Sequence, residues 1–162
     1  MTTPAPDAPP QLLAFLTEHQ IEAEFLAPGV PMPTVIAAAV AIGVSEDRIL
    51  KTLLFRDELG HYVVAIANGT GRVSPTRLAE ASGLGLPSAA SPASVLAVTG
   101  YPAGGVAPIG LPGNLPVIVD QGVAELPMVF AGGGRENLLL RLDPADIIRL
   151  NRAIVAPIVD GD

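Results

Sequence analysis

The sequence predicts a single domain of the α/β or α+β class, and three observations support this prediction. Segments with helical spacing of apolar residues alternate with short strand-like runs, some of which are joined as hairpins. No internal repeat or linker divides the 162 residues, which are enough to bury one substantial core. The composition, 49% hydrophobic and 15% charged, argues against a disordered chain. We therefore expect one domain over residues 11–162, preceded by a flexible proline-rich leader at residues 1–10.

The first elements follow from local patterns. Residues 11–20 place leucines at helical spacing and predict an amphipathic helix. Residues 22–26 alternate glutamate with apolar side chains, which is typical of a half-exposed strand. Residues 34–42 are rich in alanine, are entered through prolines and are closed by Gly43, so a second helix is expected there. Residues 45–48 then cap or turn the chain into the next strand.

A hairpin and two capped helices are expected next. The apolar runs 49–55 and 61–67 flank a polar connection and predict two paired strands. Each of the dipeptides Ser74-Pro75 and Ser91-Pro92 combines an N-cap serine with a proline at the first helical position. These signals predict one helix that ends near Gly83 and a shorter one that reaches about Val98.

The C-terminal part begins with a long irregular segment and ends with a helix. Residues 99–113 are rich in glycine and proline and predict a loop. Short strands are then expected at residues 116–119, 128–131 and 138–142. Asp143 is placed as the N-cap of a final helix over residues 144–150.

Lys51 is the only lysine of the chain and lies within the apolar run 49–55. Side chains of a strand alternate between two faces, so Lys51 shares a face with Ile49, Leu53 and Phe55. Its aliphatic stem can cross apolar surface while the ammonium reaches a cleft. A lysine at a strand end that extends to water is the alternative interpretation.

Two glycine-rich loops are candidates for a binding site. In the first, from Gly100 to Gly113, Gly104 and Gly105 would let backbone N–H groups approach a ligand, and Pro108 would stiffen the far side. The second, Gly132 to Arg135, could form a nest of amides that binds an anion. An ordinary surface loop and a tight hairpin remain the respective alternatives.

Other classes of chemistry have little support in the sequence. The net charge of −7 disfavours broad nucleic-acid binding, so any contact with a nucleic acid must be local. The chain has no cysteine, and its two histidines show no metal-ligand spacing, so we expect neither a metal site nor a cofactor. No secretory signal or membrane-spanning segment is visible, and a cytoplasmic protein is the default expectation. Asp120 follows a buried strand and could face a cleft, although a turn aspartate is commoner there.

Four segments, in this order, resemble the YbaK/ProX family, the stand-alone relatives of the bacterial prolyl-tRNA synthetase editing domain. They are Lys51-Thr52-Leu53-Leu54-Phe55, Thr99-Gly100-Tyr101 with Gly104 to Gly110, Leu115 to Asp120, and Gly132-Gly133-Gly134 running into Leu138-Leu139-Leu140. The likeness covers roughly residues 12–150. It implies a mixed, mostly antiparallel and partly barrel-like sheet with flanking helices.

The resemblance also implies an activity, which is hydrolysis of a wrongly attached amino acid from the 3′ end of a tRNA. Lys51 takes the position of the family's essential lysine, and Gly104 to Pro108 takes that of its Gly-x-x-x-Pro loop, so Lys51, Gly104 and Gly105 are the expected catalytic residues. Expected substrate-binding residues are Pro108, Phe55, Ala131, Gly132, Gly133 and Asn137, with Ile36 as a further wall candidate. Some members carry a serine where this chain has Ala131, so a role of that hydroxyl in selecting the substrate is in doubt here.

The substrate expected from the resemblance is a small residue such as Cys, Ala, Ser or Thr on tRNA-Pro or a related tRNA. A water, helped by the neighbouring ribose hydroxyl, would attack the activated ester, and amides of the Gly104 loop would stabilise the oxyanion. Partners are the aminoacyl-tRNA 3′ end and a synthetase. The alternative function is a module that binds tRNA or a synthetase without hydrolysis.

Overall fold

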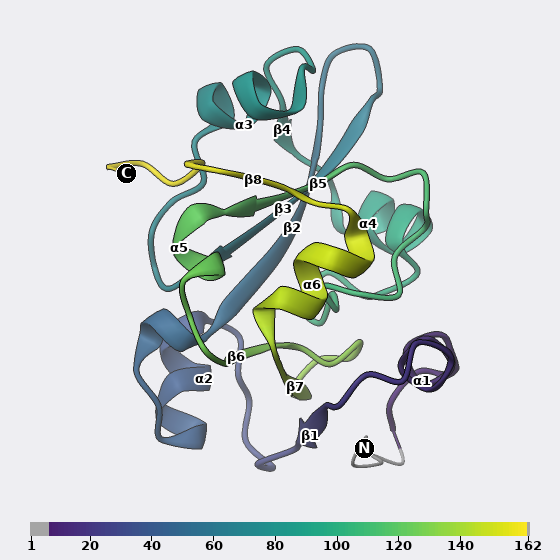
Figure 1. Cartoon of the computed structure of the whole chain (residues 1–162), viewed down its shortest axis with the longest axis vertical. Coiled ribbons are helices and arrows are strands. Elements are labelled where there is room, and N and C mark those ends of the chain that lie inside the picture. Colours follow the sequence, from purple (N-terminus) through teal and green to yellow (C-terminus); the bar gives the residue numbers. More distant parts are fainter. Residues whose placement is uncertain (1–6, 162) are drawn as a thin grey trace.

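The computed structural model describes residues 7–161, which fold into two β-sheets with helices around them (Figure 1). The predicted α/β class is confirmed. The expected leader lies partly outside the described residues, which begin at Asp7, and helix α1 already begins at Pro10. Figure 1 shows α2 and α3 at opposite ends of the molecule's long axis. No helix of the described part is long and apolar enough to cross a membrane.

The larger sheet has five strands in the order β4-β2-β3-β5-β8. The central hairpin pairs β2 with β3 in antiparallel register, with Lys51 opposite Ala67. Strand β4 extends the antiparallel side, while β5 and β8 add in parallel on the other side. The strand bounds are β2 Leu50–Arg56, β3 Tyr62–Asn68, β4 Ser88–Ala89, β5 Val117–Asp120 and β8 Ile154–Ala156.

The smaller sheet has three antiparallel strands in the order β1-β7-β6. Their bounds are β1 Glu24–Leu26, β6 Val129–Gly132 and β7 Leu139–Leu142. An isolated parallel bridge between Ile49 and Phe130 connects this sheet to the start of β2. The pairing is therefore mixed and mostly antiparallel, as expected.

Capping residues explain why the predicted helices begin and end where they do. The side chains of Thr34, Ser74, Ser91 and Asp143 each accept a hydrogen bond from a backbone N–H of the first turn. The helices are α1 Pro10–Glu18, α2 Val35–Ile42, α3 Pro75–Ser82, α4 Pro92–Thr99, α5 Gln121–Ala124 and α6 Pro144–Asn151, with a 3₁₀ turn η1 at Glu46–Arg48. Elements α5, β4 and β8 were not predicted, because each is only two to four residues long.

Strand β3 separates two hydrophobic cores, since both of its faces are buried. Val64 and Ile66 face the core shared with the smaller sheet and α1. Val63 and Ala65 face a second core, which contains Leu78 of α3 and the C-terminal segment. A strand that is buried on both faces is expected to be apolar at every position, and residues 62–67 fit this pattern.

Asp120 ties the C-terminal segment to the end of β5. Its side chain is buried, and Oδ1 accepts hydrogen bonds from the backbone N–H groups of Ile158 at 2.9 Å and Val159 at 3.3 Å. Oδ2 accepts from the N–H of Gly122 at 3.0 Å and so caps α5. Asp120 is therefore a structural aspartate in a turn and not part of a cleft.

Replacing Asp120 with alanine should destabilise the domain, because buried N–H groups would lose their acceptor. We expect a loss of about 1–3 kcal/mol in the free energy of unfolding, measured by urea denaturation. Asp160→Ala, which removes an exposed carboxylate from the same segment, is the matched control. Equal stability of the two variants would contradict the structural role of Asp120.

Candidate active site

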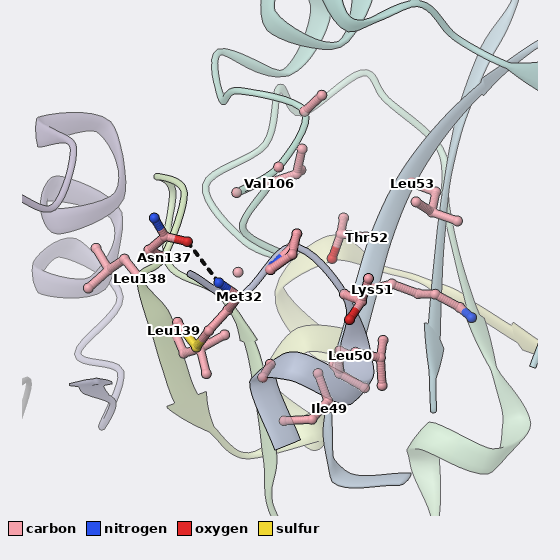
Figure 2. A pocket seen from close by; sticks show the side chains of 18 residues that line it. Met32, Ile49, Leu50, Lys51, Thr52, Leu53, Val106, Asn137, Leu138 and Leu139 are labelled. Carbon is pink, nitrogen blue, oxygen red and sulfur yellow. Dashed lines mark hydrogen bonds between the residues drawn. The ribbon is translucent and has the colours of Figure 1, made fainter. Parts of the chain in front are cut away.

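A pocket of about 200 Å³ lies where the start of β2 meets α2 and the two glycine-rich loops (Figure 2). It brings together five of the predicted site residues, Lys51, Gly104, Gly105, Gly132 and Asn137. The other lining residues are Met32, Pro33, Thr34, Val35, Ala38, Ile49, Leu50, Thr52, Leu53, Ala103, Val106, Leu138 and Leu139. Most of these are apolar, and sequence reasoning did not find them because they converge only through tertiary packing.

The two glycine-rich loops pack directly against each other and form one wall. The N–H of Gly134 donates to the carbonyl of Gly105 at 2.8 Å. A Cβ built on Gly105 would lie 2.3 Å from the carbonyl carbon of Arg135, and one built on Gly132 would lie 2.3 Å from the carbonyl oxygen of Val106. Such backbone-to-backbone approach is open only to glycine at these positions.

The first loop brings backbone amides to the pocket. The N–H of Gly105 donates to the carbonyl of Pro102 at 2.9 Å, so it is engaged within the loop. Gly104 is exposed, and its N–H finds no acceptor among residues 7–161. The Gly104 N–H is therefore not engaged within the described part of the chain.

Buried hydrogen bonds fix the far side of this loop. The Tyr101 hydroxyl donates to the carbonyl of Ile109 at 2.9 Å, and burial raises the pKa of Tyr101. The side-chain amide of Asn151 donates to the carbonyl of Pro108 at 2.6 Å. Pro108 is buried and does not line the pocket, so it braces the loop from behind.

Thr52 places a polar atom on the pocket side of β2. The residue is 8% exposed, and its Oγ1 has no hydrogen-bond partner within the described part of the chain. An unpaired buried hydroxyl costs about 1–3 kcal/mol, which a ligand or water at this position would offset. Sequence reasoning missed Thr52, although strand alternation places it on the face opposite Lys51.

Asn137 supports the opposite wall. Its Oδ1 accepts a hydrogen bond from the N–H of Met32 at 2.9 Å, shown as the dashed line in Figure 2. Its φ of 62° is a left-handed conformation, which asparagine tolerates better than most residues. The bond fixes the segment before α2 against the turn between β6 and β7.

Lys51 lines the pocket, but its ammonium does not point into it. Figure 2 shows the side chain extending away from Met32 and Asn137. The Nζ atom donates to the carbonyl of Gly69 at 3.1 Å and to that of Gly71. Partial burial lowers the pKa of Lys51. The ammonium thus lies on the other side of β2 from Thr52, as the alternation of a strand requires.

The remaining predicted site residues lie outside this pocket. Phe55, together with Lys51 and Leu53, lines a second hollow on the outer side of β2. Ala131 is fully buried in the main core, and Gly133 closes the turn by donating its N–H to Leu138. Ile36 is 54% exposed on α2, whose pocket-facing residues are Val35 and Ala38. In residues 7–161, no three His, Cys, Asp or Glu side chains gather as a group that could hold a metal ion.

Comparison with sequence families identifies one domain over most of the chain. A model described as "Aminoacyl-tRNA editing domain" matches residues 30–150. The uncharacterized protein YwhH of Bacillus subtilis is 33% identical over 114 residues, which cover 70% of this chain and 72% of YwhH. EbsC of Enterococcus faecalis, named as a candidate Cys-tRNA(Pro)/Cys-tRNA(Cys) deacylase, is 27% identical over 75% of this chain and 74% of its own length.

Similarity also extends to part of a longer enzyme. A proline–tRNA ligase of Streptococcus suis is 30% identical over 104 residues, which cover 64% of this chain but 17% of the ligase. Among solved structures, hypothetical protein APE2540 superposes with a TM-score of 0.84 at 32% identity, covering 93% of this chain and 99% of that one. A structure described as a candidate trans-editing enzyme for prolyl-tRNA synthetase has a TM-score of 0.80 at 27% identity, covering 98% and 100%.

Gly105→Ala should disturb the pocket wall, because the added methyl group collides with the backbone of Arg135. Overpacking of this kind costs about 1–3 kcal/mol, and we expect a lower melting temperature with shifted amide resonances in both glycine-rich loops. Gly113→Ala is the control, since its Cβ would meet nothing within 4 Å. Equal melting temperatures for the two variants would contradict the close packing.

Proposed function

The chain belongs to the aminoacyl-tRNA editing domain family, and we propose that it hydrolyses the ester bond of a mischarged aminoacyl-tRNA. The products are the free amino acid and the intact tRNA. The substrate class we infer is a small amino acid, such as Cys, Ala, Ser or Thr, on tRNA-Pro or a related tRNA. The relative named for Cys-tRNA deacylation and the matching segment of proline–tRNA ligases support this choice.

The observation that carries this proposal is the small, mostly apolar pocket with a few polar atoms at one wall. Its volume of about 200 Å³ is below the range of about 300–1,000 Å³ that is usual for ligand sites, so it suits a small acyl group and not a whole nucleotide. Val35, Ala38 and Leu139 supply the apolar surface. One methylene changes recognition by about 1–3 kcal/mol, so such a pocket accepts several small side chains.

The reaction requires a water and an oxyanion donor. We infer that the Gly104 N–H receives the carbonyl oxygen as it becomes negative, while the Thr52 hydroxyl orients the attacking water or the substrate's amino group. Water adds to the ester carbonyl, and the tetrahedral intermediate collapses with loss of the ribose oxygen. That oxygen takes up a proton, and the amino acid leaves with a carboxylate. The neighbouring ribose hydroxyl assists, so no protein nucleophile is needed.

Lys51 would act from the other side of β2. An ammonium there would hold the phosphate of the terminal nucleotide while the acyl group occupies the pocket. Recognition of the rest of the tRNA is assigned to a synthetase partner, because the chain as a whole is acidic, with a net charge of −7. A substrate of this kind places the protein in the cytoplasm.

The activity is tested by deacylation of a panel of aminoacyl-tRNAs. Cys, Ala, Ser, Thr and Pro on tRNA-Pro, with cognate controls, are incubated with the native chain and with Lys51→Ala. We expect hydrolysis of at least one small-residue ester and its loss in the variant. Lys51→Met, which keeps the aliphatic stem, should be equally inactive and controls for lost packing.

A chain that leaves every ester intact would contradict the proposal. Binding of tRNA or a synthetase in that case would indicate the non-hydrolytic module instead. Full activity of Lys51→Ala would show that the lysine is not needed for the reaction. It would not contradict the proposal that the chain is a hydrolase.

Thr52→Val should make the domain more stable and the proposed reaction slower. The change removes an unpaired buried hydroxyl at nearly constant shape, so the free energy of unfolding should rise by about 1 kcal/mol. The same change should lower kcat/KM for the best ester by at least about tenfold, the equivalent of one hydrogen bond in the transition state. Thr52→Ser, which retains the hydroxyl, is the control and should keep most of the activity. Undiminished activity of Thr52→Val would exclude the hydroxyl from the reaction.

A further inference from the structure

The N-terminal segment, residues 7–18, lies against both glycine-rich loops of the acyl pocket. It precedes residues 30–150, the part of the chain that the family model matches. Ala8, Leu12 and Leu16 are buried in the main core and anchor the segment there. The turn between β6 and β7 points toward α1 (Figure 1). The segment therefore has a fixed place beside the two loops.

Gln11 joins the two ends of the first glycine-rich loop. Its side-chain Nε2 donates to the carbonyl of Thr99 at 3.1 Å and to the carbonyl of Gly110 at 2.6 Å. An amide nitrogen carries two hydrogens, so this one group can serve both carbonyls. Between these two ends, residues 103–106 line the pocket. Thr99 and Gly110 thus form the neck of a loop that one side chain holds closed.

The neck is tightly packed from both sides. A Cβ built on Gly100 would lie 2.5 Å from Oε1 of Gln11, and one built on Gly110 would lie 2.5 Å from the Tyr101 hydroxyl oxygen. Both glycines have a positive φ, 81° and 71°, which glycine adopts without strain. Tyr101 is buried, whereas Gln11 is exposed. Tyr101 therefore holds the neck from the core, and Gln11 holds it from the solvent side.

The same N-terminal segment also contacts the second glycine-rich loop. Arg135 Nη1 donates to the carbonyl of Asp7 at 3.1 Å and lies 3.6 Å from its carboxylate. A Cβ built on Gly134 would lie 2.5 Å from Cγ of Pro9. The ion pair is mostly exposed and contributes little by itself. The Gly134 N–H bond to the carbonyl of Gly105 connects this contact to the first loop.

A closed neck matters for an amide that has to meet a developing negative charge. Such a donor is effective when it is held in place before the reaction begins. A displacement of about 1 Å can reduce the rate by about a hundredfold. Gln11 does not line the pocket, so any effect it has on the Gly104 amide passes through the loop.

We propose that Gln11 is a positioning residue, which keeps the first glycine-rich loop closed and thereby holds the Gly104 N–H in place for the ester carbonyl. The effect on catalysis rests on the proposed function, whereas the closure of the loop does not. Gln11 touches neither the substrate nor the reacting atoms.

Gln11→Glu and Gln11→Lys distinguish this role from a contribution to helix stability. Gln11 is the second residue of α1, where the helix dipole favours an acidic side chain over a basic one. For the two carbonyls the order is reversed, because an ionised carboxylate has no N–H and an ammonium has three. Gln11→Met removes the donors at similar length without adding a charge.

Hydrogen exchange of the full chain, without substrate, measures the closure of the loop. The amides of Tyr101, Gly105 and Gly134 are hydrogen-bonded within the two loops. We expect them to exchange about tenfold faster or more in Gln11→Met and Gln11→Glu, and within about threefold of the native rate in Gln11→Lys. The melting temperature should fall by less than about 4 °C. The same three changes at Gln121, an exposed glutamine at the start of α5, are the controls.

Deacylation of the best ester of the panel measures the effect on the reaction. Gln11→Met and Gln11→Glu should lower kcat by about tenfold and leave KM within about twofold. The oxyanion contact is made in the transition state, while the apolar walls that bind the acyl group stay intact. Gln11→Lys should recover most of kcat.

Each outcome supports or overturns a stated part of the proposal. Unchanged exchange of the loop amides in Gln11→Met and Gln11→Glu would overturn it, and so would a loop that glutamate protects better than lysine. Faster exchange with an undiminished kcat would refute the positioning role in the reaction. A native chain that hydrolyses no ester would refute the proposed function together with that role, while faster exchange in Gln11→Glu would still support the closed neck.

Discussion

The alternation of side chains along β2 is the constraint on which the proposed site depends. Successive residues of a strand point to opposite faces, so Thr52 faces the small pocket while Lys51 and Phe55 face the outer hollow. The strand is held in register by its antiparallel partner β3, with Thr52 opposite Ile66, and a slip of one residue would exchange the two faces. One strand thus places an apolar cavity with an unpaired hydroxyl on one side and the Lys51 ammonium on the other. In the proposed reaction, the acyl group and the terminal phosphate of one substrate lie on these two sides.

Close backbone packing of the two glycine-rich loops forms the wall of the proposed acyl site that faces β2. The loops that contain Gly105 and Gly132 approach to distances that leave no room for a Cβ. Their mutual hydrogen bond uses backbone groups, and Tyr101 locks the first loop from within the core. A rigid loop of this kind can keep an amide such as that of Gly104 beside the pocket without a partner of its own. Preorganised donors of this type stabilise developing charge without reorganisation during the reaction.

The sequence predicts elements whose ends are marked by local chemistry. Ser74 and Asp143 cap helices where expected, and the hairpin around residues 56–60 forms as its apolar flanks predict. Within the site, the glycine loops and Lys51 could be identified because such residues are unusual in their surroundings. Thr52 and the apolar lining could not, since a threonine in a strand or a valine in a helix looks ordinary until tertiary packing brings them together. Strand alternation predicts the face of β2 on which Lys51 lies, but the acceptors of its ammonium could not be predicted, because they belong to a turn about twenty residues away.

The most direct test of this account is a crystal structure with a non-hydrolysable substrate mimic, the 3′-alanylamide of 3′-amino-3′-deoxyadenosine 5′-phosphate. The account predicts the alanyl group beside Thr52, its carbonyl oxygen within hydrogen-bond distance of the Gly104 N–H, and the phosphate beside the Lys51 ammonium. An alanyl group outside the pocket, or one whose carbonyl oxygen points away from Gly104, would contradict the central claim that the two faces of β2 divide one aminoacyl nucleotide between them.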